Sequence, residues 1–285
     1  MSVVDFIIES AKIPSFSTFE ERLHPYLYEI LNECNDVNIV HIKDNNVLVE
    51  IGLKQGVKPV VVTSHLDKIN HFGKDYPEVL NVEVKEGEIV GQMDDTAGIG
   101  ICLNLIKKAQ DNDFPPLVVL FSEMEESTGL KHHPHLLKNN GKDVGPQIGA
   151  KRLCEYIDTQ NLDPVAFITI DTTPIFKGES GVALYTEHWE KTGFMPDSTL
   201  RGKIEKIKSF VLSCDSEVTL ANGTNDYMVY GEYFGRPEKG NVPSIAIEPA
   251  IYPYHQIGEG VFIEDIMRIE SILEKLLLNF NFSEL

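Results

Sequence analysis

The sequence predicts an α/β protein with a central mixed, largely parallel β-sheet flanked by helices. Short β-rich runs alternate with amphipathic helices along the 285 residues, which favours layered α/β packing. Four apolar runs also end in, or shortly before, acidic residues or histidine; they lie at 59–67, 116–126, 165–171 and 244–249. Buried central strands that carry functional groups at their carboxyl ends have this pattern.

The first third of the chain predicts two helices and then a hairpin. Residues 2–12 and 19–34 have the apolar spacing of helices, with Pro14-Ser15 between them and Thr18 as a candidate N-cap. Residues 37–52 contain two β-rich runs around the turn Asp44-Asn45-Asn46, which indicates a hairpin. The first apolar strand, 59–67, follows.

The rest of the chain alternates strands and helices. Residues 82–90 alternate in polarity around Glu86-Gly87 and predict a second hairpin. Helices are predicted at 96–110, 149–160 and 262–278. The three remaining apolar strands lie between them, so several chain segments with polar ends should meet at one edge of the sheet.

Composition excludes several classes of protein. The 25 basic and 44 acidic residues give a net charge of 25 − 44 = −19, which argues against binding to nucleic acid or to an anionic membrane surface. There is no apolar run of about 18 residues and no basic segment at the start, so we expect neither a spanning helix nor a signal peptide. Four widely spaced cysteines without a CxxC pair predict reduced thiols in a cytoplasmic protein.

Histidines and acids follow the predicted strands at five places. The candidates are His65-x-Asp67, Asp94-Asp95, Glu125-Glu126, Asp171 and His255. Taken singly, each has an ordinary explanation as a cap, a solvated turn or a packed histidine. Gathered at one sheet edge, they would form a dense negative cluster, which is costly unless cations occupy it. Imidazole nitrogens mixed with carboxylate oxygens suit Zn²⁺, with Co²⁺ or Mn²⁺ as alternatives.

The motifs around these residues resemble the co-catalytic di-zinc exopeptidase superfamily, which includes zinc aminopeptidases, peptidase T-like tripeptidases, deacylases and carboxypeptidases. The matching strings are VVTSHLD (61–67), VGQMDDTAGIG (90–100), LFSEMEESTGL (120–130), FITID (167–171) and YPYHQIGEG (252–260). Weaker similarity at 13–23, 44–52 and 223–234 extends the resemblance over most of the chain, in the family's order. It implies a zinc-exopeptidase (phosphorylase/hydrolase-like) fold.

The resemblance also implies metal-ligand roles. It assigns one divalent ion to His65, Asp94 and Asp171, and a second to Asp94, Glu126 and His255. Asp94 would bridge the two ions, which would be Zn²⁺, or else Co²⁺ or Mn²⁺. Ions about 3.5–4 Å apart can share a water and stabilise a tetrahedral intermediate.

Three further roles follow from the same resemblance. Asp67 would orient His65. Asp95 is not expected to bind metal, and the Asp94-Asp95 peptide is expected to be cis. Family spacing in the string 121–126 selects Glu125, and not Glu123, as the general base and acid.

The number of residues between the expected ligands indicates which branch of the family the sequence resembles. Only 255 − 171 = 84 positions separate two expected ligands, and His65 lies only 29 before Asp94. Neither interval leaves room for the inserted domains of other branches. We therefore expect a single catalytic domain, 1–285, without a large inserted dimerisation domain.

The favoured function is an aminopeptidase acting on short peptides. A deacylase or amidohydrolase acting on acylated amino acids, a carboxypeptidase, a single-metal glutaminyl cyclase-like enzyme and a non-catalytic binding protein remain alternatives. Five arginines leave few groups to bind a substrate carboxylate, which weakly disfavours a carboxypeptidase. The sequence does not fix the oligomeric state.

One segment departs from the family pattern. Residues 131–148 lie between the Glu125-Glu126 motif and the Gly-Ala helix start, where relatives have almost nothing. We expect a loop or lid near the active site. Its histidines, His132, His133 and His135, are expected to face solvent more readily than to bind substrate or metal.

Overall fold

The fold is built on an eight-stranded sheet. The computed structural model describes residues 1–126, 132–142 and 144–285. In these, the strand order is β1-β2-β6-β3-β7-β10-β8-β9. The bounds are β1 Val37–Ile42, β2 Asn46–Ile51, β3 Val60–His65, β6 Leu117–Ser122, β7 Ala166–Ile170, β8 Val182–Tyr185, β9 Thr219–Ala221 and β10 Ser244–Pro249. Strands β6, β3, β7 and β10 run parallel, whereas β1, β2 and β8 supply the antiparallel pairs. The predicted fold class is confirmed.

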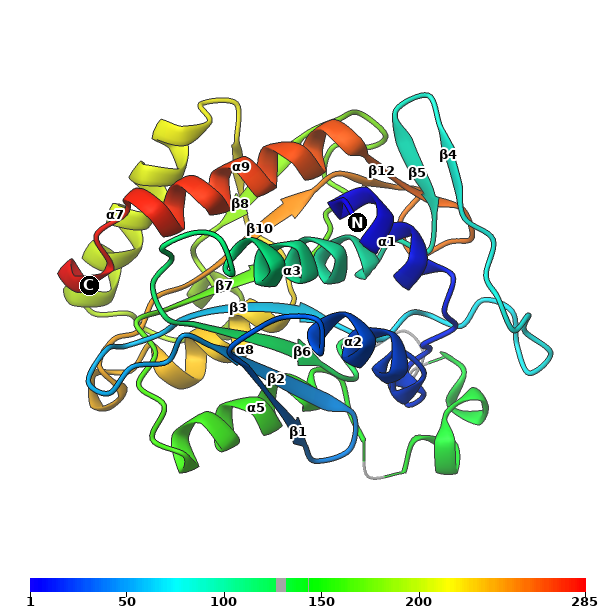
Figure 1. Ribbon diagram of the computed structural model, residues 1–285, viewed down its shortest axis with the longest axis horizontal. Coiled ribbons are helices and arrows are strands. Elements are labelled where there is room, and N and C mark those ends of the chain that lie inside the picture. The colour runs from blue at the N-terminus through cyan, green and yellow to red at the C-terminus, as the bar shows by residue number, and fades with distance from the viewer. Residues whose placement is uncertain (127–131, 143) are drawn as a thin grey trace.

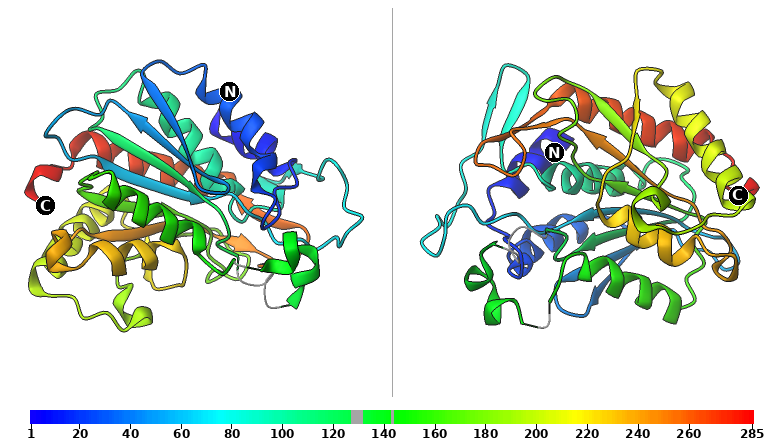
Figure 2. Two further views of the ribbon diagram at one scale, coloured as in Figure 1. Left: turned by 90° about the horizontal axis from the view of Figure 1, so that it is seen from below. Right: turned by 180° about the vertical axis from the view of Figure 1, so that it is seen from behind.

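Helices cover both faces of this sheet (Figures 1 and 2). One layer contains α1 (Val3–Ala11), α2 (His24–Leu31), α3 (Thr96–Lys108), α7 (Ser198–Cys214) and α9 (Ile263–Asn279). The other contains α5 (Ile148–Thr159) and α8 (Asp226–Phe234). Shorter helices are α6 (Trp189–Thr192), η1 (Glu20–Arg22), η2 (Pro134–Leu136), η3 (Lys138–Gly141), η4 (Pro237–Lys239) and η5 (Phe282–Glu284).

Burial on both faces explains the continuous apolar runs of the central strands. Side chains alternate between faces with a period of two, so Val60 and Val62 pack into the core beneath the first helix layer and Val61 into the core beneath the second. On the second face, Phe167 stacks against Tyr230, with ring centroids 5.0 Å apart. A strand covered on both sides needs apolar residues at every position.

A second, smaller sheet joins segments that are distant in sequence. Its order is β11-β12-β5-β4, with bounds β4 Glu83–Lys85, β5 Glu88–Gly91, β11 Ile251–Tyr252 and β12 Glu259–Phe262. The predicted 82–90 hairpin is confirmed as β4 and β5. Strand β12 pairs antiparallel with β5. This pairing places the chain after His255 beside the chain before Asp94.

The expected helix over 19–34 is wrong at its start. A 3₁₀ turn, η1, precedes α2, and Thr18 caps neither helix. Thr18 has a φ of 70°, and its main-chain N–H donates to the carboxylate of Glu20. The hydrogen bond to this buried acid competes with regular helix formation at the start of the segment.

The segment between β7 and the His255 loop completes the main fold. It forms β8, α6, α7, β9 and α8, and β8 and β9 extend the main sheet beyond β10. All four cysteines lie within the described residues and are free thiols. Within the described part of the chain, no helix is long and apolar enough to cross a bilayer.

Close packing of α1 on α3 gives a stability prediction. A Cβ added at Gly100 would lie 2.3 Å from Cγ1 of Ile7, so Gly100→Ala forces the two helices apart. We expect it to lower the free energy of unfolding by about 1–3 kcal/mol, measured by urea denaturation. The matched control is Gly202→Ala in α7, where a Cβ meets nothing within 4 Å. It should raise stability by about 0.5–1 kcal/mol through helix propensity. Equal stability of Gly100→Ala and wild type would contradict this description of the contact.

Candidate metal centre

The predicted ligands come from the carboxyl ends of three parallel strands and from two connecting loops. His65 is the last residue of β3, Asp171 directly follows β7, and Glu126 lies four residues after β6. Asp94 lies between β5 and α3, and His255 between β11 and β12. The structure thus brings together residues that span 190 positions of the sequence, at the edge where open α/β sheets place their sites.

Asp94 lies between the two histidines. Its Oδ1 is 3.0 Å from Nε2 of His65, and its Oδ2 is 3.3 Å from Nε2 of His255. Nε2 of His65 is also 3.8 Å from Asp171 Oδ1, and Nε2 of His255 is 3.4 Å from Glu126 Oε2. Each oxygen of one carboxylate therefore faces a different imidazole.

Two groups of donor atoms result, and they share Asp94. His65, Asp94 and Asp171 form one group, and Asp94, Glu126 and His255 the other; the donor atoms within each lie within 4.8 Å of one another. A third, overlapping group of His65 with Glu125 and Glu126 meets the same criterion, which shows that Glu125 also borders the centre.

The residues fit divalent cations. Asp94, Asp171 and Glu126 are buried side by side, and Glu126 Oε1 has no hydrogen-bond partner among the described residues. Burial and the neighbouring Asp94 and Glu125 carboxylates raise the pKa of Glu126 well above its ordinary value. Such a cluster favours positive charge at its centre. Two imidazole nitrogens with three carboxylates are a donor set that suits Zn²⁺.

His65 is oriented by Asp67. The Nδ1 atom of His65 lies 3.0 Å from the main-chain oxygen of Asp67 and 3.4 Å from its Oδ1. An Nδ1–H that donates to these oxygens leaves the Nε2 lone pair directed at Asp94. Burial opposes ionisation of Asp67, but hydrogen bonds from His65 and Ser17 keep its pKa below the usual value.

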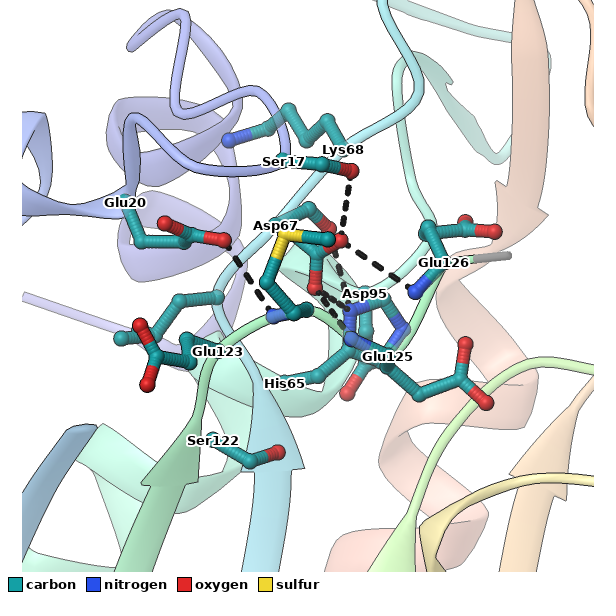
Figure 3. A network of polar contacts seen from close by, with 12 residues as sticks. Ser17, Glu20, His65, Asp67, Lys68, Asp95, Ser122, Glu123, Glu125 and Glu126 are labelled. Carbon is teal, nitrogen blue, oxygen red and sulfur yellow. Dashed lines mark hydrogen bonds and ion pairs between the residues drawn. The ribbon is translucent and has the colours of Figure 1, made fainter. Parts of the chain in front are cut away.

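Glu123 and Glu125 differ sharply in their surroundings, on opposite sides of the loop in Figure 3. The Glu123 carboxylate is held by Arg152 at 2.5 Å, by the side chain of Asn46 at 2.6 Å and by the main chain of Asn45 at 3.0 Å. Glu125 uses only its main-chain N–H in this network. Burial, with Asp171, Asp226 and Asp94 nearby, raises the pKa of Glu125 well above normal.

Asp95 has a structural role. Its side chain caps α3 by accepting from Gly98 N–H at 2.9 Å, and it accepts from Ser64 Oγ at 2.6 Å. The Asp94-Asp95 peptide is cis, as expected. Asp95 belongs to neither donor group, so its carboxylate is directed away from the centre.

Comparisons with known proteins give a match in structure only. No protein-family model matches the sequence, and no curated protein matches it significantly. A TET aminopeptidase from a marine sediment Thaumarchaeota archaeon superposes with a TM-score of 0.69 at 11% identity, over 99% of this chain and 97% of that one. The Pyrococcus horikoshii TET1 peptidase superposes with a TM-score of 0.66 at 12% identity, over 98% of this chain and 100% of that one. Aminopeptidase PepT from Bacillus cereus superposes with a TM-score of 0.63 at 14% identity, over 96% of this chain and 97% of that one. This chain has the fold of these aminopeptidases. The resemblance inferred from the motifs is confirmed at the level of the fold.

Within this aminopeptidase fold, three more residues border the centre that sequence reasoning did not single out. Glu259 accepts from the main-chain N–H of Met93 at 3.0 Å and of Asp94 at 3.4 Å, and so holds the Asp94 segment. The ring of Tyr254 stacks on His255, with centroids 3.7 Å apart. Partial burial raises the pKa of Tyr254, and the nearby Asp94 and Glu126 carboxylates add to this. Tyr254 and Glu259 both lie in the segment YPYHQIGEG, which resembles the family, so the sequence contained a signal that could have identified them.

Asp226 is the third such residue. It lies at the start of α8 and accepts from Ser122 Oγ at 2.5 Å. Burial raises the pKa of Asp226 to about 7, and the Asp171 carboxylate contributes. It belongs to the segment 223–234, whose weaker similarity to the family gave it no assigned role.

The expected lid lies only partly within the described residues, since 131 and 143 fall outside them, as do 127–130 of the preceding motif. The described part forms η2 and η3 and contacts the N-terminal segment, where Lys138 N–H donates to Thr18 Oγ1 at 3.0 Å. His132, His133 and His135 are exposed, as expected. None of them joins the donor groups found among the described residues.

Proposed function

We propose that this chain is a metal-dependent aminopeptidase that removes N-terminal residues from short peptides. One observation carries the proposal: the two oxygens of Asp94 face two different imidazoles, while Glu125 borders the same centre without a side-chain hydrogen bond among the described residues. Paired ligand groups beside an acid that can accept a proton are what co-catalytic amide hydrolysis requires.

The chain offers two sites for divalent ions. His65, Asp94 and Asp171 would hold one ion, and Asp94, Glu126 and His255 the other. We propose Zn²⁺, with Co²⁺ or Mn²⁺ as alternatives, from the donor types. When bound, such ions supply Lewis acidity that acidifies water and polarises a carbonyl.

The chain's own groups move the protons. Glu125, which borders both ligand groups, accepts a proton from the attacking water and returns it to the leaving amine. The main-chain N–H of Glu125 donates to Asp67 Oδ1 at 2.9 Å, which holds the main chain of Glu125 in place. Tyr254, whose ring stacks on His255, carries a hydroxyl that would donate a hydrogen bond to the carbonyl oxygen as negative charge develops on it.

The arginines support an aminopeptidase over a carboxypeptidase, because each is engaged elsewhere. Arg152 pairs with Glu123 and Asp44, Arg268 with Asp215 and Asp265, and Arg236 with Glu232; Arg22 lies over Phe19 and Tyr76, and Arg201 over Trp189. A carboxypeptidase commonly needs a bidentate cation for the substrate carboxylate.

We further propose that residues 1–285 act as one catalytic domain, because the interval between Asp171 and His255 is used by elements of the main fold. The described part of 131–148 would border the substrate site as a loop. The free thiols suit a reducing compartment, the cytoplasm.

A substrate panel tests the function. The protein is incubated with Zn²⁺, Co²⁺ or Mn²⁺ and offered tripeptides with a free N-terminus, the same tripeptides N-acetylated, and N-acyl amino acids. We expect release of the N-terminal residue from the free tripeptides only. Cleavage of the N-acyl compounds alone would indicate a deacylase. Bound metal without cleavage of any compound would indicate a binding protein.

A further inference from the structure

Three consecutive amides of the loop that carries Glu125 and Glu126 donate to two buried carboxylates (Figure 3). Met124 N–H donates to Glu20 Oε1 at 3.2 Å, Glu125 N–H to Asp67 Oδ1 at 2.9 Å and Glu126 N–H to Asp67 Oδ2 at 3.2 Å. Successive main-chain N–H groups that converge in this way form a concave anion-binding site. Here the anions are side chains of the protein itself.

The first of these amides belongs to a residue in an unusual conformation. Met124 has a φ of 54°, in the left-handed region, which costs a residue with a side chain roughly 1–2 kcal/mol. Its carbonyl oxygen accepts from Gln147 N–H at 2.6 Å. A Cβ at Gly149 would lie 2.2 Å from the main-chain oxygen of Glu123, so α5 packs directly against this turn. Glu125 and Glu126 directly follow this turn.

Burial of the Glu20 carboxyl group is energetically unfavourable, so packing alone does not explain why this position is occupied by an acid. It is fully buried, and burial together with the Asp67 carboxylate raises its pKa to about 8. Three donors hold it: Thr18 N–H at 2.9 Å, Met124 N–H at 3.2 Å and Asn45 Nδ2 at 2.7 Å. An apolar side chain would fill the same space without the cost of burying an acid. An apolar side chain could not, however, accept a hydrogen bond from the Met124 N–H.

We propose that Glu20 is a positioning residue, which fixes Met124 in its left-handed conformation and so directs Glu125 toward the substrate and Glu126 toward the metal. The inference concerns the position of the Glu20 oxygen atoms. It rests on the proposed function, because a positioned base matters only if the chain catalyses a reaction.

Two conservative variants separate the position of the oxygen atoms from the presence of a carboxyl group. Glu20→Asp keeps the carboxyl group but withdraws its oxygens by one methylene group. Glu20→Gln replaces the carboxyl group by an amide but keeps an Oε1 that can accept from Thr18 and Met124. The control is Glu29→Gln on the exposed face of α2. For each we measure kcat and KM on a free tripeptide, the melting temperature, and the visible absorption spectrum of the Co²⁺-loaded protein, which reports how the metal ligands are arranged.

We expect Glu20→Asp to lower kcat by at least about tenfold with KM within about threefold, because small misplacement of a catalytic group has effects of this size or larger. Its Co²⁺ spectrum should differ from wild type, since Glu126 follows the same turn. Glu20→Gln and Glu29→Gln should remain within about threefold of wild type and keep its spectrum.

Two results would overturn the proposal: a folded Glu20→Asp variant with the kcat and spectrum of wild type, or activity losses in both Glu20 variants that only follow their melting temperatures. Failure of the proposed function is distinguishable from either. If wild type cleaves no substrate, the aminopeptidase assignment fails, and the Co²⁺ spectra still decide whether Glu20 positions Glu126.

Discussion

We expect that replacing Glu125 with alanine will lower kcat by a factor of at least about 10² while the bound metal stays at the wild-type level. Loss of a general base has an effect of this size. Metal retention is expected because the two donor groups proposed to hold the ions, His65 with Asp94 and Asp171, and Asp94 with Glu126 and His255, do not use Glu125. The measurements are steady-state kinetics on a free tripeptide and elemental analysis of the dialysed protein.

The control for this prediction is Glu155→Ala, an exposed glutamate on α5 that should leave kcat unchanged. Loss of metal from Glu125→Ala would mean that the roles of Glu125 and Glu126 are exchanged, in line with the third donor group of His65, Glu125 and Glu126. Full activity would exclude Glu125 as the base. Glu123 is a weak replacement, because Arg152 and two asparagines already hold its carboxylate.

The arrangement of the candidate site follows from features that a single sequence displays. Strands buried on both faces are continuous apolar runs, and the polar residues that end them must meet where parallel strands end. For this reason His65 and Asp171 could be placed together from their positions alone. The adjacent acids Glu125 and Glu126 needed the resemblance to a family, because spacing within an acidic turn does not tell which side chain faces inward.

The network around Glu20 could not be predicted in this way. Glu20 and Met124 are 104 positions apart, and neither lies in a periodic pattern that shows their contact. Met124 has a left-handed conformation and bonds to Glu20 and Gln147 through its main chain, whereas local propensity disfavours that conformation and does not predict it. The pairing of β12 with β5 could not be predicted either, because short strands at distant positions in the sequence do not specify a partner.

Helix α7 is a different kind of omission. Its buried residues Leu200, Ile204, Ile207 and Val211 follow helical spacing, and Asp197 supplies an N-cap by accepting from Leu200 N–H at 2.8 Å. The helical pattern of residues 198–214 is present in the sequence, although no helix was predicted there.

Asp94→Ala should abolish the binding of both metal ions, whereas Asp171→Ala and Glu126→Ala should each weaken the binding of one ion. The reason lies in the geometry: the Asp94 oxygens are 3.0 Å and 3.3 Å from the two imidazoles, while Asp171 and Glu126 each belong to only one of the two groups proposed to hold the ions. Elemental analysis after dialysis against a weak chelator should give about two ions per chain for wild type, about one for each single-group variant and close to none for Asp94→Ala.

Thermal unfolding provides a second measure of the same prediction. A ligand that binds only the folded state stabilises it by RT ln(1 + [L]/Kd), about 2.7 kcal/mol at a hundredfold excess over Kd. Added Zn²⁺ should therefore raise the melting temperature of wild type clearly and that of Asp94→Ala hardly at all, with Asp171→Ala and Glu126→Ala between them. If Asp94→Ala retained one ion and a half-sized shift, like the other two variants, Asp94 would serve one metal group only, and the shared-carboxylate description of the centre would be wrong.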